Sequence, residues 1–108
     1  MGVLMSRPDE DGLKHYVVEL AESAQLALLE ISSRDDALKV RRRFLMLEVA
    51  PGMGTVYDPV YESSMPDHEV RVTFAGHYGL YYIIDEENSK VFIEYIEDCR
   101  RNPLNKFS

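Results

Sequence analysis

Alternation of apolar and polar residues dominates the last third of the chain and predicts three consecutive β-strands. The strands are expected over residues 69–74 (EVRVTF), 78–85 (YGLYYIID) and 90–98 (KVFIEYIED). Only short turns join them, and short turns connect strands that run antiparallel. The pattern therefore predicts a three-stranded antiparallel meander.

Upstream of the meander, the apolar spacing predicts one strand and two helices. β-Branched and aromatic residues over 15–20 (HYVVEL) predict the strand, and leucines at mixed helical spacing with alanines predict a helix over 21–31. Ser33 and its neighbours interrupt this helix and offer an N-cap for a second one, expected over about 36–49. Pro51 and the glycine after it end the second helix.

The resulting order, β-α-α-β-β-β, predicts an α+β fold of two layers with an antiparallel sheet packed against a helical hairpin. One face of the sheet should lie under the hairpin, and the other should be partly open. A loop over residues 52–68 connects the two halves. The 108 residues suffice for one domain, expected over 14–108, after a flexible polar tail over 1–13.

The charge of the chain restricts the functions that it can serve. Nineteen acidic against twelve basic residues give a formal net charge of -7. Broad binding to nucleic acid needs many lysine and arginine contacts to phosphates, so this charge disfavours it. One small basic pocket remains compatible with the composition.

The residues that commonly bind metals or form disulfides are sparse. The single cysteine, Cys99, allows no internal disulfide and favours a reduced, cytoplasmic setting. The three histidines, His15, His68 and His77, show no metal-ligand spacing, so neither a metal nor another cofactor is expected. No run approaches the ~20 apolar residues that span a bilayer, and no membrane partner is expected.

A run of basic residues lies in the second predicted helix, at Lys39, Arg41, Arg42 and Arg43. Neighbouring helical residues point about 100° apart, so the run cannot share one face. Two interpretations remain open. The run is either a solvated helix surface balanced by nearby acids, or a docking surface for an acidic partner segment.

Arg71 is the other notable cation, because it lies inside a predicted strand. It alternates with Val70 and Val72 and should therefore point to the opposite, solvent-exposed face. It is either an ordinary surface arginine or part of a functional site. The residues that could lie near it on the same sheet are Tyr78, Tyr82, Arg100 and Arg101.

Five short motifs, together with the order of the elements, resemble a known family. The motifs are LAE at 20–22, APGMG at 50–54, VRV at 70–72, GHYGLYY at 76–82 and CRRNP at 99–103. They resemble the RelE/ParE superfamily of bacterial toxins, which come from toxin–antitoxin and plasmid stabilisation modules. The resemblance covers about residues 16–103.

The resemblance implies the toxin of a type II toxin–antitoxin module, which binds a cellular target and is neutralised by a cognate antitoxin. RelE-like members cut messenger RNA on the ribosome, and ParE-like members inhibit DNA gyrase. The implied targets are thus either the ribosome with its messenger RNA or DNA gyrase. The implied assemblies are a homodimer or a toxin–antitoxin hetero-oligomer. A protein-interaction module that has lost toxicity is a further alternative.

The resemblance also implies roles for particular residues. For a metal-independent endoribonuclease, the implied catalytic residues are Arg71, His77, Tyr82 and Arg100. The implied RNA- or target-binding residues are Arg71, Tyr78, Arg100 and Arg101. The antitoxin is expected to bind near Phe44 and Leu47 and along the sheet edge.

Two departures from the family pattern weaken the ribonuclease interpretation. Gly79 stands where the family has an arginine, and Cys99 or Asp98 stands where it has a histidine. Fixed cations offset the charge that builds on a reacting phosphate, and loss of one such group lowers a rate on the order of a hundredfold. We therefore expect a degenerate nuclease site with weak activity.

Overall fold

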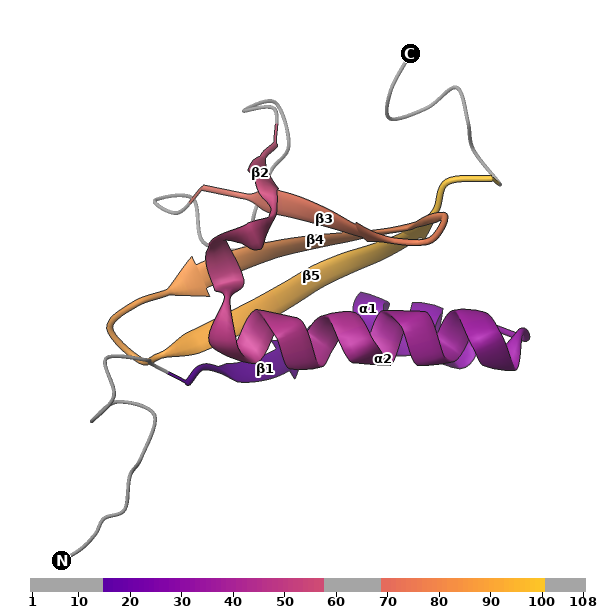
Figure 1. Ribbon diagram of the computed structural model, residues 1–108, viewed down its shortest axis with the longest axis horizontal. Coiled ribbons are helices and arrows are strands. Elements are labelled where there is room, and N and C mark those ends of the chain that lie inside the picture. Colours follow the sequence, from indigo (N-terminus) through magenta and orange to yellow (C-terminus); the bar gives the residue numbers. More distant parts are fainter. Residues whose placement is uncertain (1–14, 58–68, 101–108) are drawn as a thin grey trace, which may run out of the picture.

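The computed structural model describes residues 15–57 and 69–100, which form an α+β fold of two layers (Figure 1). The elements in chain order are β1 (Val17–Leu20), α1 (Glu22–Leu29), α2 (Arg34–Val49), the 3₁₀-helix η1 (Pro51–Met53), β2 (Thr55–Val56), β3 (Arg71–Ala75), β4 (Tyr78–Asp85) and β5 (Lys90–Asp98). The predicted class and the helical hairpin are confirmed. The predicted tail, residues 1–13, lies outside the described residues.

The five strands form one sheet in the order β1-β5-β4-β3-β2. β3, β4 and β5 make the predicted meander, with Arg71 opposite Tyr82 and Tyr78 opposite Asp98. β1 runs parallel to β5, with Leu20 opposite Ile93. The sheet is therefore mixed rather than wholly antiparallel, because the two helices provide the long crossover that a parallel pairing requires.

The start of α2 follows the expected capping chemistry. The hydroxyl of Ser33 accepts a hydrogen bond from the Asp36 backbone N–H at 3.2 Å, and the helix begins at Arg34, two residues before the expected start.

The strand β2 lies within the predicted loop and was not expected from the sequence. Two residues are too few to show alternation, and pairing with β3 is what makes Thr55–Val56 a strand.

Both helices cover the same face of the sheet (Figure 1). A large apolar core lies between the two layers. Its fully buried members are Ala24, Val40 and Leu47 from the helices and Leu80, Tyr82, Val91 and Ile93 from the sheet. These residues fix which face of each strand points toward the helices.

The opposite face of the sheet holds a second apolar cluster. Val70, Val72, Tyr81 and Ile83 are buried there, and the Tyr57 ring meets the Tyr81 ring edge-on with centroids 5.0 Å apart. The expectation of a partly open face is therefore not met at these residues.

Among the described helices, none is long and apolar enough to cross a membrane.

Candidate functional site

Arg71 and Tyr82 lie side by side on β3 and β4 and both bind the turn that follows α2. Arg71 Nη2 donates to the carbonyl oxygens of Gly52 at 3.2 Å and Gly54 at 2.8 Å. The Tyr82 hydroxyl donates to the Pro51 carbonyl at 2.5 Å and accepts from the Gly54 N–H at 3.1 Å. Two predicted catalytic side chains thus hold this turn against the sheet.

Arg71 occupies the helix-covered face, beyond the C-terminal end of α2. Arg71 does point away from Val70 and Val72, as the alternation predicts, but these valines belong to the second apolar cluster, so the predicted solvent-exposed face is wrong. Tyr82 is fully buried on the same face as Arg71. A role for Tyr82 in proton transfer to a bound substrate would therefore require the Pro51–Gly54 turn to move.

A second group of predicted site residues lies at the start of β4. His77 Nε2 is 3.4 Å from Asp36 Oδ2 and 4.0 Å from Asp98 Oδ1, but it makes no hydrogen bond of good geometry and is shielded from solvent. Arg100 Nε and Nη2 each lie 3.2 Å from an oxygen of Asp98. The rings of His77 and Tyr78 lie 4.5 Å apart.

Charges within this second group compensate one another. The hydrogen bond from Arg100 is the main cause that lowers the pKa of Asp98 below its usual value. Burial, followed by the nearby negative charge of Asp98, raises the pKa of the Tyr78 hydroxyl. Arg100 is thus an exposed cation whose charge is already paired with a neighbouring carboxylate.

The two groups are far apart. Tyr78 and Tyr82 are four positions apart on β4, which corresponds to about 13 Å at ~3.3 Å per residue. The structure therefore brings Arg71 together with Tyr82, and His77 with Tyr78 and Arg100, but it does not bring the four predicted catalytic residues to one patch. Arg101 lies outside the described residues.

Gly79 faces the second apolar cluster, opposite Phe74 on β3. A Cβ atom at this position would lie 3.2 Å from Phe74 Cε1 and 3.4 Å from Tyr81 Cε1. The Phe74 ring therefore covers the place from which an arginine side chain would extend. A cation at position 79 would require this half-exposed ring to move.

The residues predicted for antitoxin binding divide into buried and exposed ones. Leu47 is fully buried and Phe44 packs against the main core, so their own side chains serve the fold. Their neighbours Leu45, Met46 and Val49 point outward and are 61%, 44% and 47% exposed. At the sheet edges lie the short strands β1 and β2.

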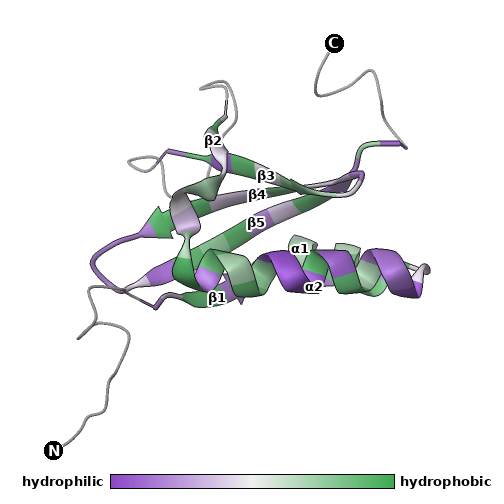
Figure 2. Ribbon diagram, viewed as in Figure 1, coloured by the Kyte–Doolittle hydropathy of each residue, from purple (hydrophilic) through white to green (hydrophobic). Residues whose placement is uncertain are grey.

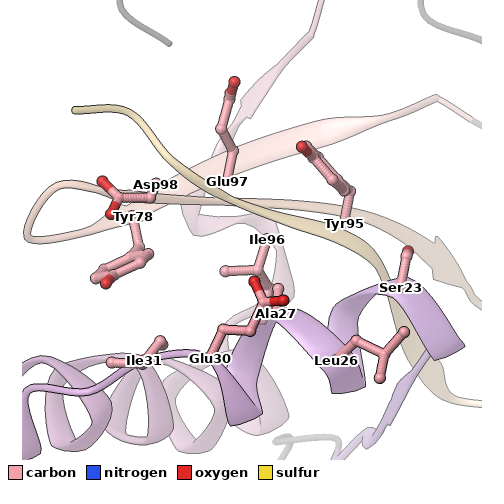
Figure 3. Close-up of a pocket in the computed structure, with 10 residues that line it drawn as sticks. All are labelled: Ser23, Leu26, Ala27, Glu30, Ile31, Tyr78, Tyr95, Ile96, Glu97 and Asp98. Atoms are coloured by element: carbon pink, nitrogen blue, oxygen red, sulfur yellow. The ribbon is translucent and has the colours of Figure 1, made fainter. Parts of the chain in front are cut away.

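A cleft that the sequence analysis did not predict opens between α1 and β5 (Figure 3). Its volume is about 290 Å³. Apolar walls come from Leu26, Ala27, Ile31 and Ile96, with Tyr78 at one end and the Glu30 and Asp98 carboxyl groups at the rim. The Ser23 hydroxyl donates to the Glu94 carbonyl at 2.8 Å and holds α1 to β5 beside the cleft. About 65 residues separate the two walls in the sequence, so no local motif signals this site.

No protein-family profile matches the chain, and no curated protein sequence matches it. Solved structures do. An archaeal RelE–RelB complex from Pyrococcus horikoshii OT3 matches with a TM-score of 0.62 at 15% identity, covering 78% of this chain and 94% of the other. The toxin–antitoxin complex RelBE2 of Mycobacterium tuberculosis matches with a TM-score of 0.59 at 23% identity, covering 79% and 92%.

The isolated E. coli RelE toxin also matches, with a TM-score of 0.58 at 15% identity, covering 77% of this chain and 83% of the other. The similarity thus extends over nearly the whole of each toxin. It lies in the fold, since few side chains are shared. The chain has the fold of RelE-type toxins.

Proposed function

We propose that this chain is the toxin of a type II toxin–antitoxin module, that it acts by binding a cellular target, and that a cognate antitoxin neutralises it. The RelE-type fold is the observation that carries the proposal, and two of the matched structures are complexes of a RelE protein with its antitoxin. The module would work in the bacterial cytoplasm, in the manner of plasmid stabilisation systems. The toxin would be stored as a toxin–antitoxin hetero-oligomer.

The arrangement of cations supports action by binding over RNA cleavage. Arg71 is bonded to backbone carbonyls, and Arg100 is paired with Asp98. A reacting phosphate needs several fixed cations close together. In the described part of the predicted site, Arg71 lies opposite Tyr82 in the middle of β4, whereas Arg100 follows Asp98, which lies opposite Tyr78 at the start of β4. The net charge of -7 also favours a protein target over a nucleic acid.

Expression from an inducible promoter, with and without the product of the neighbouring small reading frame, tests the proposal. We expect growth arrest without the neighbour and normal growth with it. Cleavage of ribosome-bound message and gyrase supercoiling are then measured on the same cells. Absence of arrest would favour the non-toxic interaction module and contradict the proposal.

Arginine variants separate the two toxic mechanisms. Arg100→Ala removes a largely exposed side chain, and Arg71→Lys keeps a charge while it loses the two-carbonyl contact. Message cleavage that both variants abolish, with folding unchanged by circular dichroism, would establish a ribonuclease. We expect only weak or undetectable cleavage by the unsubstituted protein.

A further inference from the structure

Glu97 is a buried acid that the proposed function does not use. It is 3% exposed, less than any other acidic residue in the described part of the chain. Within residues 15–57 and 69–100, the Tyr81 hydroxyl, which donates to Glu97 Oε1 at 3.1 Å, is the only hydrogen-bond donor to this carboxylate, and no ion pair includes it. A buried carboxylate is costly unless a cation or several donors compensate its charge, and here a single hydroxyl does so.

The Glu97 side chain lies on the sheet face opposite the two helices. Figure 3 shows Glu97 and Tyr95 on one side of β5 and Ile96 on the other side, toward α1. Alternation along a strand requires this arrangement. Figure 2 shows β5 as an apolar strand interrupted by polar segments. The carboxylate therefore shares its face with the aromatic rings of the second apolar cluster, which includes Tyr81 and Tyr95.

These rings are neutral and close to one another. The ring centroids of Tyr81 and Tyr95 lie 6.0 Å apart, and the Tyr57 ring meets the Tyr81 ring edge-on. Burial first, and Glu97 second, raise the pKa of the Tyr81 and Tyr95 hydroxyls, so both phenols stay uncharged at neutral pH. The faces of aromatic rings carry negative electrostatic potential and attract cations. One carboxylate and several rings thus favour a positively charged ligand.

Gly79 contributes no side chain beside the carboxylate. Strand pairing places it directly opposite Phe74 on β3 and Glu97 on β5. The Phe74 ring leans over this glycine, because a Cβ atom there would lie 3.2 Å from Phe74 Cε1. Since the Phe74 residue is 44% exposed, rotation of its side chain can uncover the row without unfolding the strand.

We propose that Glu97, the rings of Phe74, Tyr81 and Tyr95 and the backbone at Gly79 form a binding site for a guanidinium group. The group would lie over Gly79, donate N–H hydrogen bonds to the carboxylate and stack against a ring. A guanidinium suits these partners better than an ammonium, because it is planar, more weakly hydrated and carries donors that match a carboxylate. The site goes beyond the proposed function, since charge and ring geometry define its ligand whether or not the chain is toxic.

The described cations of the chain bind other groups. Arg71 binds the carbonyls of the turn after α2, Arg100 binds Asp98, and Lys90 pairs with Glu19. A phosphate or carboxylate ligand would be repelled by the buried negative charge. The described residues also include no group of three side chains that could hold a metal ion. The guanidinium would therefore come from a separate molecule or from a residue outside the described ranges.

Three capped amino acids test the site on the full chain. N-acetyl-arginine amide carries a guanidinium, N-acetyl-lysine amide an ammonium, and N-acetyl-citrulline amide an uncharged group of the same shape as the guanidinium. Titration followed by backbone amide NMR shifts should give affinities in the order arginine, lysine, citrulline, with the shifts centred on residues 79, 81 and 97. No binding of the arginine probe, or equal binding of the citrulline probe, would overturn the proposal.

Two glutamine variants locate the charge that the arginine probe recognises. Glu97→Gln keeps the length of the side chain and its contact with Tyr81, and it should weaken the arginine probe by about tenfold or more. Glu30→Gln removes the same charge at the rim of the α1–β5 cleft, on the helix side, and should leave the affinity unchanged. Equal losses of affinity in both variants would mean that the probe responds to net charge alone, and would overturn the site.

A double-mutant cycle tests the same row without a probe. Gly79→Arg places a guanidinium directly opposite Glu97, whereas Gly79→Met adds a long uncharged side chain. Gly79→Arg should have the higher Tm of the two, and this difference should disappear when Glu97→Gln is added to each. Gly79→Arg should also no longer bind the arginine probe. A Tm difference that Glu97→Gln leaves unchanged, or undiminished probe binding by Gly79→Arg, would overturn the proposal.

Two further measurements separate the sources of the guanidinium. A glycine–serine peptide with one central arginine represents a protein partner, and the capped arginine represents a small ligand. Tighter binding of the peptide assigns the site to an arginine side chain of a partner, and equal affinities assign it to a small guanidine compound. Arg101 lies outside the described residues. If Arg101→Gln strengthens the binding of the arginine probe, the chain's own arginine competes for the site, and an external ligand is overturned.

Discussion

The Arg71 guanidinium and the Tyr82 hydroxyl meet on the same turn, one through two carbonyl oxygens and the other through a carbonyl and an N–H. Each residue pairs with the other across β3 and β4. The contacts give both residues a structural role, because buried backbone groups need hydrogen-bond partners. They join the end of α2 to the first half of the meander.

Tyr82→Phe should lower the free energy of unfolding by about 1–3 kcal/mol, because it leaves the Pro51 carbonyl and the Gly54 N–H without their buried partner. Urea unfolding at pH 7 measures the change. Tyr16→Phe is the control, since the Tyr16 hydroxyl donates to the exposed Glu86 carboxylate, and it should stay within about 0.5 kcal/mol. Equal losses of unfolding free energy in the two variants would show that the Tyr82 hydrogen bonds to the turn stabilise the fold no more than an exposed hydrogen bond does.

Gly54→Ala should destabilise by about 1–3 kcal/mol, because the added carbon would lie 2.5 Å from the Val72 carbonyl oxygen and 2.7 Å from the Tyr82 hydroxyl. Gly52→Ala, two residues away, meets nothing within 4 Å and should be near neutral. Thermal unfolding of both variants checks the contrast. A neutral Gly54→Ala would mean that the turn can withdraw from β3.

Leu47→Ala should cost about 2–5 kcal/mol, because it opens a cavity at a fully buried position. Phe44→Ala should also destabilise, since its ring packs on the same core. Leu45→Ala, at a 61% exposed position between them, should change stability little. Chemical unfolding of the three variants tests the helix register, and a larger loss at Leu45 than at Leu47 would contradict it.

The Asp98–Arg100 pair predicts a dependence on pH. The folded-state pKa of Asp98 is lowered, so the pair stabilises the fold above the ordinary carboxyl pKa, and the contribution is lost as pH falls through the folded value. Arg100→Ala should therefore be less stable than the unsubstituted protein at pH 7. The difference should shrink in strongly acidic solution, well below the ordinary carboxyl pKa of ~3.9.

Urea unfolding at the two pH values measures this difference. Arg100→Lys is the matched control, because it keeps the charge but lacks the forked pair of N–H donors. It should recover part of the stability at pH 7. A difference between Arg100→Ala and the unsubstituted protein that persists unchanged in acid would show that the pair is not its source.

Much of the fold could be predicted, because local chemistry specifies it. Strands 78–85 and 90–98 end where expected, since strand-forming residues meet short turns on both sides. Ser33 marked the start of α2 through its side chain. The strand over 15–20 was predicted, but its parallel pairing with β5 and the two-residue strand β2 could not be, because both depend on a partner strand elsewhere in the chain.

The candidate site was harder to predict than the fold. Alternation showed that Arg71 points away from Val70 and Val72, but the sequence does not show which face the helices cover. The separation of His77 from Tyr82 follows only once the bounds of β4 are known, because His77 lies in the turn before Tyr78 and Tyr82 lies in the middle of the strand. The sequence shows that Gly79 departs from the family pattern. The structure adds that the Phe74 ring covers this position and leaves little room for a larger side chain.

Leu47 buries one side of α2 in the core, whereas Leu45 leaves the opposite side of the same helix apolar and largely exposed. A partner that binds only the folded chain adds to its apparent stability by mass action. A partner on the exposed side of α2 would then stabilise the helix in addition to the core contacts on its buried side. In a cell, release of the partner would leave a less durable protein, so the lifetime of the liberated chain would limit how long its effect persists.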